Sequence, residues 1–465
     1  MRVLLVAAKR SRYTGESISA PFQGLLSIAA ALRDSAFGDT RGTRVRVVDE
    51  QLESLKPSSG AATNDLDEPP ADIVGVQACT SSLKNGLDTL RRERERCARV
   101  LRVVGGSGVA SRAAAEAIIS ADAADVVVQG EGEATFAELV EIYGTIGRAG
   151  FSRVPAVCYR GDDGAPVWTA KRSPIEPLDR LPFPARDLVD MAAYRSVSRG
   201  RAGNLITSRG CSYACAYCYS KHQWGIGQRR FSVRRTLDEV RILVDDYHLD
   251  RIRIEDDDFL EDREWVTALC TGLIDSGLSG RMEWEAKARP DHLDGDLLPL
   301  LRQSGCFRLL MGVETLDQLL LSRMARGLKA SLLEQSIDRM HQNGIGVQAT
   351  LILGIPGESD RAMRHTLSWL DEKLDHEHDI SSPCFFVPFY SEIADAMSRQ
   401  LPFRVHVDDT DCYTGHVPVV SSDACSLREL QALYDDMQAN RRGMYERIAH
   451  LAEPDEVVRR MGSVW

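Results

Sequence analysis

Three cysteines within one short segment constrain this chain of 465 residues more than any other feature of its sequence. Cys211, Cys215 and Cys218 have the spacing C-x3-C-x2-C, close enough for three thiolates to face one soft metal centre. An iron–sulfur cluster normally has four cysteine ligands, so with three one iron would be open to an exogenous ligand. Structural zinc is the alternative, for which His222 is the nearest fourth ligand in the sequence.

The cysteine loop, with Tyr217 directly before Cys218, resembles the signature loop of the radical S-adenosylmethionine (SAM) superfamily. The resemblance implies that the three cysteines hold a [4Fe-4S] cluster. In this superfamily the cluster cleaves SAM to a 5′-deoxyadenosyl radical, which abstracts a hydrogen atom from the substrate. The resemblance also implies that Tyr217 forms an aromatic wall near the adenine, while packing within the loop is the alternative.

Apolar, strand-like runs alternate with helix-like segments in the first part of the chain, residues 1–147. This βαβ order predicts an α/β domain with a doubly wound parallel sheet, a Rossmannoid fold. Residues 148–200 are predicted to be a connector that contains a hairpin around 161–164 and then four prolines. The predicted strands of the first sheet are 3–7, 44–48, 73–78, 102–104 and 125–128.

The same alternation resumes in residues 201–390 and predicts a partial (β/α)6 barrel, in which chemistry takes place at the carboxyl ends of the strands. The cysteine loop directly follows the first of these strands. Residues 391–465 are predicted to be a mainly helical tail that caps the open side of the barrel. The predicted barrel strands are 204–208, 251–255, 282–288, 308–313, 347–353 and 380–387.

An acidic segment, Glu255-Asp256-Asp257-Asp258-Phe259, ends the second barrel strand. It resembles the D-D-x-F element of radical SAM enzymes that have a cobalamin-binding-like N-terminal domain. The resemblance implies that Asp256 and Asp257 bind the ammonium group of SAM, and that Asp258 lies nearer the substrate as a catalytic residue. A solvated acidic turn is the alternative interpretation.

Three later strand ends match the same subfamily. Arg289 follows the third strand, and its forked guanidinium suits a carboxylate, either of SAM or of a side chain. Lys287 lies on the same strand face and is a candidate proton donor or substrate contact, with a surface or salt-bridged lysine as the alternative. Glu314 in Gly312-Val313-Glu314 is a predicted SAM contact, and Gly354 lets the backbone approach the adenine.

Segments of the first domain, among them Thr80-Ser81-Ser82-Leu83 and Gly105-Gly106, resemble the cobalamin-binding-like domain of that subfamily. One departure is important. The cobalamin fingerprint supplies a histidine below the cobalt, but no histidine precedes His222 in this chain. Some relatives bind cobalamin without this histidine, and others have lost the cofactor. The missing ligand favours loss of cobalamin.

A domain without cobalamin makes methyl transfer to an unactivated carbon a poor prediction and favours a radical elimination. By analogy with the radical SAM diol-dehydratase of apramycin biosynthesis, we predict dehydration of an aminoglycoside sugar. A cobalamin-dependent radical SAM C-methyltransferase of natural-product assembly is the alternative. A non-catalytic metal or cluster sensor is the alternative from another class.

Composition supports a small-molecule enzyme. A formal net charge of −11 disfavours nucleic acid as a partner and is compatible with a cationic, sugar-like substrate, although the charge alone favours solvated acidic faces. No apolar run is long enough to span a membrane, and scattered cysteines indicate a cytoplasmic protein. The cluster would need a reductant such as flavodoxin or ferredoxin. Cys384, Cys412 and Cys425 lack the spacing of a second cluster.

Overall fold

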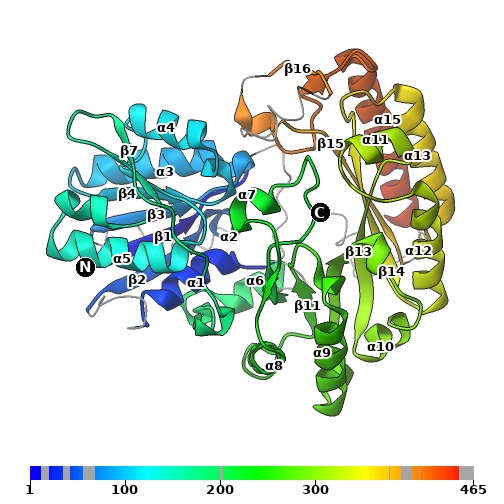
Figure 1. The fold of residues 1–465 in the computed structure, drawn as a ribbon, viewed down its shortest axis with the longest axis horizontal. Helices are drawn as coiled ribbons and strands as arrows, with labels where there is room; N and C mark the ends of the chain where they lie inside the picture. Colours follow the sequence, from blue (N-terminus) through cyan, green and yellow to red (C-terminus); the bar gives the residue numbers. More distant parts are fainter. Residues whose placement is uncertain are drawn as a thin grey trace.

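The structure, a computed structural model, describes residues 1–11, 20–34, 42–55, 69–197, 203–375, 378–388, 399, 401–407 and 409–449. It contains two large open sheets, each with its own helices (Figure 1). The predicted α/β architecture is confirmed, with a doubly wound sheet followed by a partial barrel. Residues 391–398, 400, 408 and 450–465 of the predicted tail lie outside the described residues.

The first sheet has the strand order β2-β1-β3-β4-β5-β6-β7. Its first five strands in sequence are parallel, and β6 and β7 add an antiparallel hairpin. This is the hairpin predicted within the connector, so the sheet extends beyond residue 147. The strands are β1 (Arg2–Ala7), β2 (Arg44–Asp49), β3 (Ile73–Gln77), β4 (Leu101–Gly105), β5 (Val126–Val128), β6 (Val157–Arg160) and β7 (Pro166–Trp168).

Helices cover both faces of this sheet, which explains why its central strands are almost continuously apolar. Helices α1 (Gln23–Ala31) and α5 (Gly132–Thr145) pack on one face, around Phe136. Helices α3 (Leu83–Arg96) and α4 (Arg112–Ser120) pack on the other, around Leu90. Figure 1 shows the two layers on opposite sides of β1, β3 and β4.

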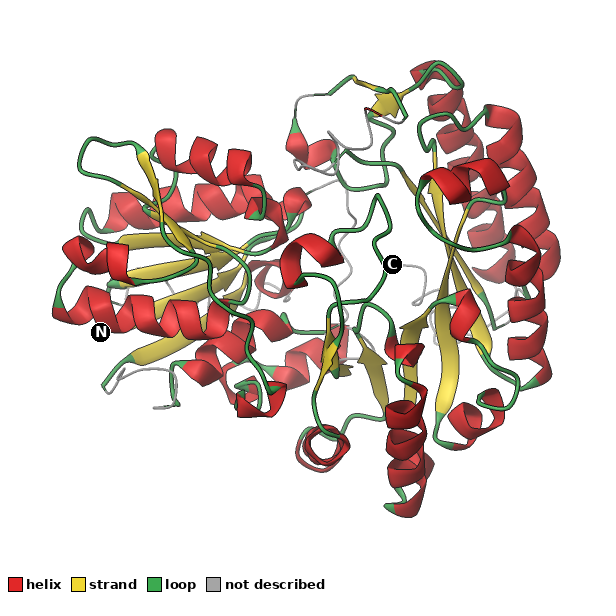
Figure 2. Ribbon diagram, viewed as in Figure 1, coloured by secondary structure: helices red, strands yellow, loops and turns green. Residues whose placement is uncertain are grey.

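The second sheet is the barrel, with the order β15-β14-β13-β12-β11-β8 and parallel pairing throughout. Among the described residues no pairing joins β8 to β15, so the barrel is open, as predicted. Helices lie outside the strands (Figure 2). The strands are β8 (Gly203–Leu205), β11 (Arg251–Ile254), β12 (Glu283–Ala288), β13 (Cys306–Glu314), β14 (Gly346–Leu353) and β15 (Ile380–Phe385).

The barrel helices have amphipathic sequences whose apolar side chains enter one continuous core that includes Trp284 and Phe259. The main helices are α8 (Val233–Arg241), α9 (Arg263–Asp275), α10 (Leu298–Gln303), α12 (Ala330–Gln342) and α13 (Asp360–Lys373). Short elements not foreseen from the sequence are α2 (Glu50–Leu55), α6 (Met191–Val197), α7 (Ser220–Trp224), α11 (Gln318–Arg323), and the pairs β9 (Ser208–Arg209) with β10 (Arg229–Arg230) and β16 (Arg404–Val405) with β17 (Val420–Ser421).

The tail contributes helix α15 (Leu427–Ala449), which packs beside α13 and extends the outer helical layer (Figure 1). Its Leu430 and Leu433 enter the barrel core. None of the helices in the described part of the chain combines the length and the apolar character that crossing a bilayer requires.

Candidate active site

The cysteine loop begins at the carboxyl end of β8 and ends at α7, at the mouth of the barrel. Gly210, directly before Cys211, has φ +88°, and a Cβ there would lie 2.3 Å from the carbonyl oxygen of Gly227. A side chain at this position would therefore displace the segment that pairs with the loop. The glycine lets the chain turn sharply from β9 into the cysteines.

Asp256 anchors the start of this loop. Its carboxylate accepts hydrogen bonds from the Thr207 amide at 2.7 Å, from the Thr207 hydroxyl and from the Ser208 hydroxyl at 2.6 Å. The side chain is fully buried, and burial raises its pKa. Its predicted contact with the SAM ammonium stays a prediction, and the structure shows that both carboxylate oxygens already have protein partners.

The protein environment favours the protonated thiol at two of the three cysteines. Burial raises the pKa of Cys211 to about 12 and also raises the pKa of Cys218. The Arg289 Nη1 lies 3.8 Å from the Cys215 sulfur. Because metal ligands must be thiolates, loading of a metal centre would release these protons, and the arginine would offset the resulting negative charge.

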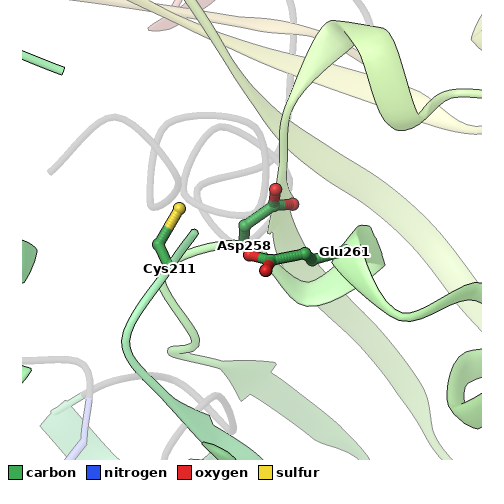
Figure 3. Close-up of side chains that lie close together, drawn as sticks. All are labelled: Cys211, Asp258 and Glu261. Atoms are coloured by element: carbon green, nitrogen blue, oxygen red, sulfur yellow. The ribbon is translucent and has the colours of Figure 1, made fainter. Parts of the chain in front are cut away.

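The three thiol sulfurs of the loop do not all lie within 4.8 Å of one another. Around tetrahedral zinc, thiolate sulfurs lie about 3.8 Å from one another. Among the described residues, one set of three potential ligands has all its atoms within 4.8 Å, and that set contains only one of the cysteines: Cys211, Asp258 and Glu261 (Figure 3). His222 does not join it. The chemistry and separation of the three cysteines therefore fit a larger iron–sulfur centre better than zinc.

Tyr217 and Glu314 meet across the mouth of the barrel. The Tyr217 hydroxyl donates a hydrogen bond of 2.9 Å to Glu314, which is buried at the end of β13 and whose pKa is raised by burial. Arg326 lies 3.7 Å from the same carboxylate. Glu314 has φ +63°, an uncommon conformation that indicates strain at a site with a function. A Cβ at Gly312 would lie 2.4 Å from Arg326, which explains the glycine of the G-x-E motif.

Arg289 follows β12 and binds a carboxylate of the protein. Its Nε and Nη2 each donate a hydrogen bond of 2.9 Å to Asp291, and its guanidinium carbon lies 3.4 Å from the centre of the Tyr213 ring. Tyr213 belongs to the cysteine loop, so this stacking holds the loop against the third strand. Of the two carboxylate partners that the sequence suggested for Arg289, the structure shows the one from a side chain, that of Asp291.

Asp258 is fully buried and faces His292, whose Nδ1 lies 2.9 Å from its carboxylate. This pairing with Asp258 raises the pKa of His292. The Nε2 of His292 is 2.9 Å from the Tyr213 hydroxyl, so these three side chains connect the acidic segment to the cysteine loop. Sequence reasoning missed His292 and Arg326, because neither lies in a motif that the resemblance supplies.

The remaining candidates have partners within the protein. Asp257 accepts a hydrogen bond of 2.6 Å from Ser220. Lys287 pairs with Glu255 at 3.2 Å. A Cβ at Gly354 would lie 2.9 Å from Leu430 of α15, so this glycine accommodates the tail helix as well as any ligand on its other side. Their predicted roles toward substrate and SAM stay predictions.

A cavity of about 1040 Å³ separates the two domains. On one side it is bounded by the loops that follow β3, β4 and β5, which contribute Cys79, Ser107 and Gly130. On the other side it is bounded by Tyr217 at the barrel mouth and by Cys384 on β15. Open α/β sheets bind ligands at the carboxyl ends of their strands, and here two such edges face one space.

Buried ion pairs join the two walls of this cavity. Arg209, two residues before Cys211, pairs with Glu133 and, at 2.9 Å, with Glu131 of the first domain. Arg229 on β10 also binds Glu131 at 2.8 Å. The side chains of Arg209, Glu131 and Glu133 are each less than a tenth exposed. The cysteine loop is therefore held directly against the first domain.

Residues 205–370 match the radical SAM superfamily model. The chain is 27% identical to an uncharacterised methyltransferase of Pyrococcus horikoshii over 72% of its own length and 71% of that protein. It is 26% identical to the anaerobic magnesium-protoporphyrin IX monomethyl ester cyclase of Rubrivivax gelatinosus, over 85% and 71% of the two chains.

Among solved structures, the fold is similar to that of the radical SAM methyltransferase TsrM of Kitasatospora setae, solved with cobalamin and a [4Fe-4S] cluster bound. The TM-score is 0.69 at 17% identity, and the match covers 88% of this chain and 81% of the TsrM chain. The chain thus contains a radical SAM domain at residues 205–370. Its radical SAM barrel follows a domain with the fold of a cobalamin-binding domain.

Proposed function

We propose that this protein is a cobalamin-dependent radical SAM methyltransferase that acts on a small molecule. The observation that carries the proposal is the cavity of about 1040 Å³ between the strand ends of the two domains. Relatives named as methyltransferases, and the likeness of the whole fold to a cobalamin-containing methyltransferase, support the same reaction. This was the alternative to the dehydration predicted from the sequence.

Residues on both sides of the cavity fit a large flat ligand such as a corrinoid. Gly130 and Gly225 line it from opposite domains, have positive φ, and have no atom within 4 Å of the position of a Cβ. A side chain at either position would project into open space. The loops after β3 and β4 complete the first wall with small residues. Bound here, cobalamin would supply a methyl carrier between the two domains.

The cysteine loop would hold the [4Fe-4S] cluster at the other wall. The cluster and SAM would supply the radical that activates the substrate carbon. Tyr217 and Glu314, joined by their hydrogen bond, would position SAM, and Arg289 would hold the loop through its stacking on Tyr213. A low-potential donor of the flavodoxin or ferredoxin class would reduce the cluster.

Radical dehydration of an aminoglycoside sugar remains the second candidate because of one observation, the lack of any histidine before His222. The first domain can supply no histidine to cobalt. The curated relatives give the dehydration no support, since their names describe methyl transfer and cyclisation.

Anaerobic reconstitution tests the two candidates. The protein is loaded with iron, sulfide and hydroxocobalamin, separated from free corrinoid, and incubated with reductant, metabolite extract and SAM carrying a deuterated methyl group. Methyl transfer predicts co-eluting corrinoid, S-adenosylhomocysteine that requires it, and a deuterated-methyl product. Formation of 5′-deoxyadenosine without bound corrinoid or S-adenosylhomocysteine would contradict methyl transfer and favour dehydration. The Cys215→Ala variant is the control for both.

A further inference from the structure

The cavity between the domains is basic although the chain as a whole is acidic. The formal net charge of the chain is −11, yet a single carboxylate, Glu131, is found among the described residues that line the cavity. Five basic side chains line the same space: Arg112, Lys171, Arg172, Lys221 and Arg229. The cavity therefore has the opposite sign to the rest of the protein.

The carboxylate and three of the five cations are already paired. Glu131 is bound by Arg209 and Arg229, and its pKa is lowered despite the opposing effect of burial. Arg172 binds Glu138, and Arg112 binds Glu116 at 2.8 Å. Each of these charged groups therefore already has a partner of opposite charge within the protein.

Lys171 and Lys221 are different. Within the part of the chain that the structure describes, neither forms an ion pair with a carboxylate. Lys171 lies just after β7 on the first domain, whereas Lys221 lies on α7, directly after the cysteine loop. The two ammonium-bearing side chains thus reach the cavity from its two walls.

The acidic segment cannot counter this charge. Asp256, Asp257 and Asp258 are absent from the cavity lining. Each has a protein partner, respectively the Thr207–Ser208 pair, Ser220 and His292. The acidic segment therefore lies away from the space where a substrate would meet both domains.

We propose that the substrate carries an anionic group, a carboxylate, phosphate or phosphonate, that Lys171 and Lys221 hold in this cavity. The inference rests on the proposed function for the identity of the reaction. The charge of the ligand is inferred from the cavity and does not depend on that function. Lysine presents a compact point charge on a flexible stem and so binds such groups without demanding one geometry. The phosphate of the cobalamin nucleotide tail has the same chemistry, so the experiment must separate the two sources.

Binding of methylphosphonate to the cluster-loaded, cobalamin-loaded protein, followed by 31P line broadening, provides the test. We expect Lys171→Met and Lys221→Met each to weaken binding about tenfold, the loss of one charge-assisted contact. Lys329→Met, at an exposed lysine outside the cavity lining, should have no effect. Lys221→Glu should abolish binding. Equal binding by all variants would overturn the proposal.

Binding of cobalamin and of cobinamide, which lacks the nucleotide phosphate, identifies the source of the anion. If the lysine variants weaken cobalamin binding but not cobinamide binding, the lysines hold the corrinoid tail and the proposal for the substrate is overturned. If both corrinoids bind the variants as they bind the native protein, the anion belongs to the substrate. A protein that binds neither corrinoid but binds methylphosphonate through both lysines would refute the proposed methyl transfer and retain the anionic substrate.

Discussion

The two walls of the interdomain cavity are built from different kinds of residues. Behind the barrel wall, at the ends of the strands, charged groups such as Arg289 and Glu314 do not line the cavity and are buried in ion pairs and hydrogen bonds. At the ends of β3 and β4 the lining residues are small and uncharged, for example Thr80 and Gly108. The buried charges fix the barrel wall in one arrangement, while the loops after β3 and β4 give the wall of the first domain a smooth, open stretch beside its charged residues. In the proposed function, the reaction chemistry belongs to the barrel wall and the accommodation of a large ligand to the wall of the first domain.

Cys215→Ala should have the largest effect, because it removes a proposed ligand of the cluster. We expect loss of nearly all cluster iron, about four per chain in the native protein, and loss of 5′-deoxyadenosine formation. Iron content and the absorbance of the reconstituted protein measure the first, and chromatography of the products measures the second. Cys97→Ala, at a half-buried cysteine outside the site, is the matched control. Retained iron and turnover in Cys215→Ala would refute the ligand assignment.

Arg209→Met tests the connection between the walls. Without this guanidinium, Glu131 keeps Arg229 as a partner, but Glu133 loses its arginine in a buried environment. The unpaired buried charge should lower the free energy of unfolding by about 3–5 kcal/mol. Urea unfolding of the cluster-free protein measures the loss. The double variant Arg209→Met, Glu133→Gln should recover part of it, because the unpaired charge is then gone. An unaltered unfolding curve for the single variant would show that the ion pairs do not hold the domains together.

The pH dependence of stability should expose the pair of His292 and Asp258. Because Asp258 raises the pKa of His292, the folded state favours the charged histidine. The stabilisation is fully present below the ordinary histidine pKa of about 6.5 and is lost as the pH rises through the higher folded pKa. At low pH we expect the free energy of unfolding of the native protein to be about 1–2 kcal/mol higher than that of the His292→Gln variant. Urea unfolding at several pH values checks this, and a difference that grows with pH would contradict it.

The barrel side of the cavity could be predicted from the sequence better than the side formed by the first domain. The strands, the cysteine loop and the ends of β11, β12 and β13 follow from hydrophobic alternation and from motifs that are contiguous in sequence. Arg326 and His292 were missed because their contacts depend on which loops the barrel brings together. The interdomain ion pairs of Arg209 with Glu131 and Glu133 were missed for the same reason. The charge of the cavity could not be foreseen, since it depends on which carboxylates the fold pairs elsewhere.

Gly130→Ala should have the smallest effect on stability, and it examines the open wall directly. Gly130 has φ +70° and nothing within 4 Å of its Cβ position, so alanine should cost about 1 kcal/mol through backbone strain alone. Gly147→Ala is a matched control, because Gly147 has φ +77°, is equally open, and does not line the cavity. Urea unfolding should show similar losses for both variants.

Corrinoid binding should then separate these two glycine variants. The methyl group at residue 130 projects into the cavity, so equilibrium dialysis with hydroxocobalamin should show weaker binding for Gly130→Ala than for Gly147→Ala. Equal affinities would mean that the ligand does not reach this part of the first domain. The smooth wall would then serve contact between the domains, and the space available to a substrate would lie closer to the barrel and its lysine on α7.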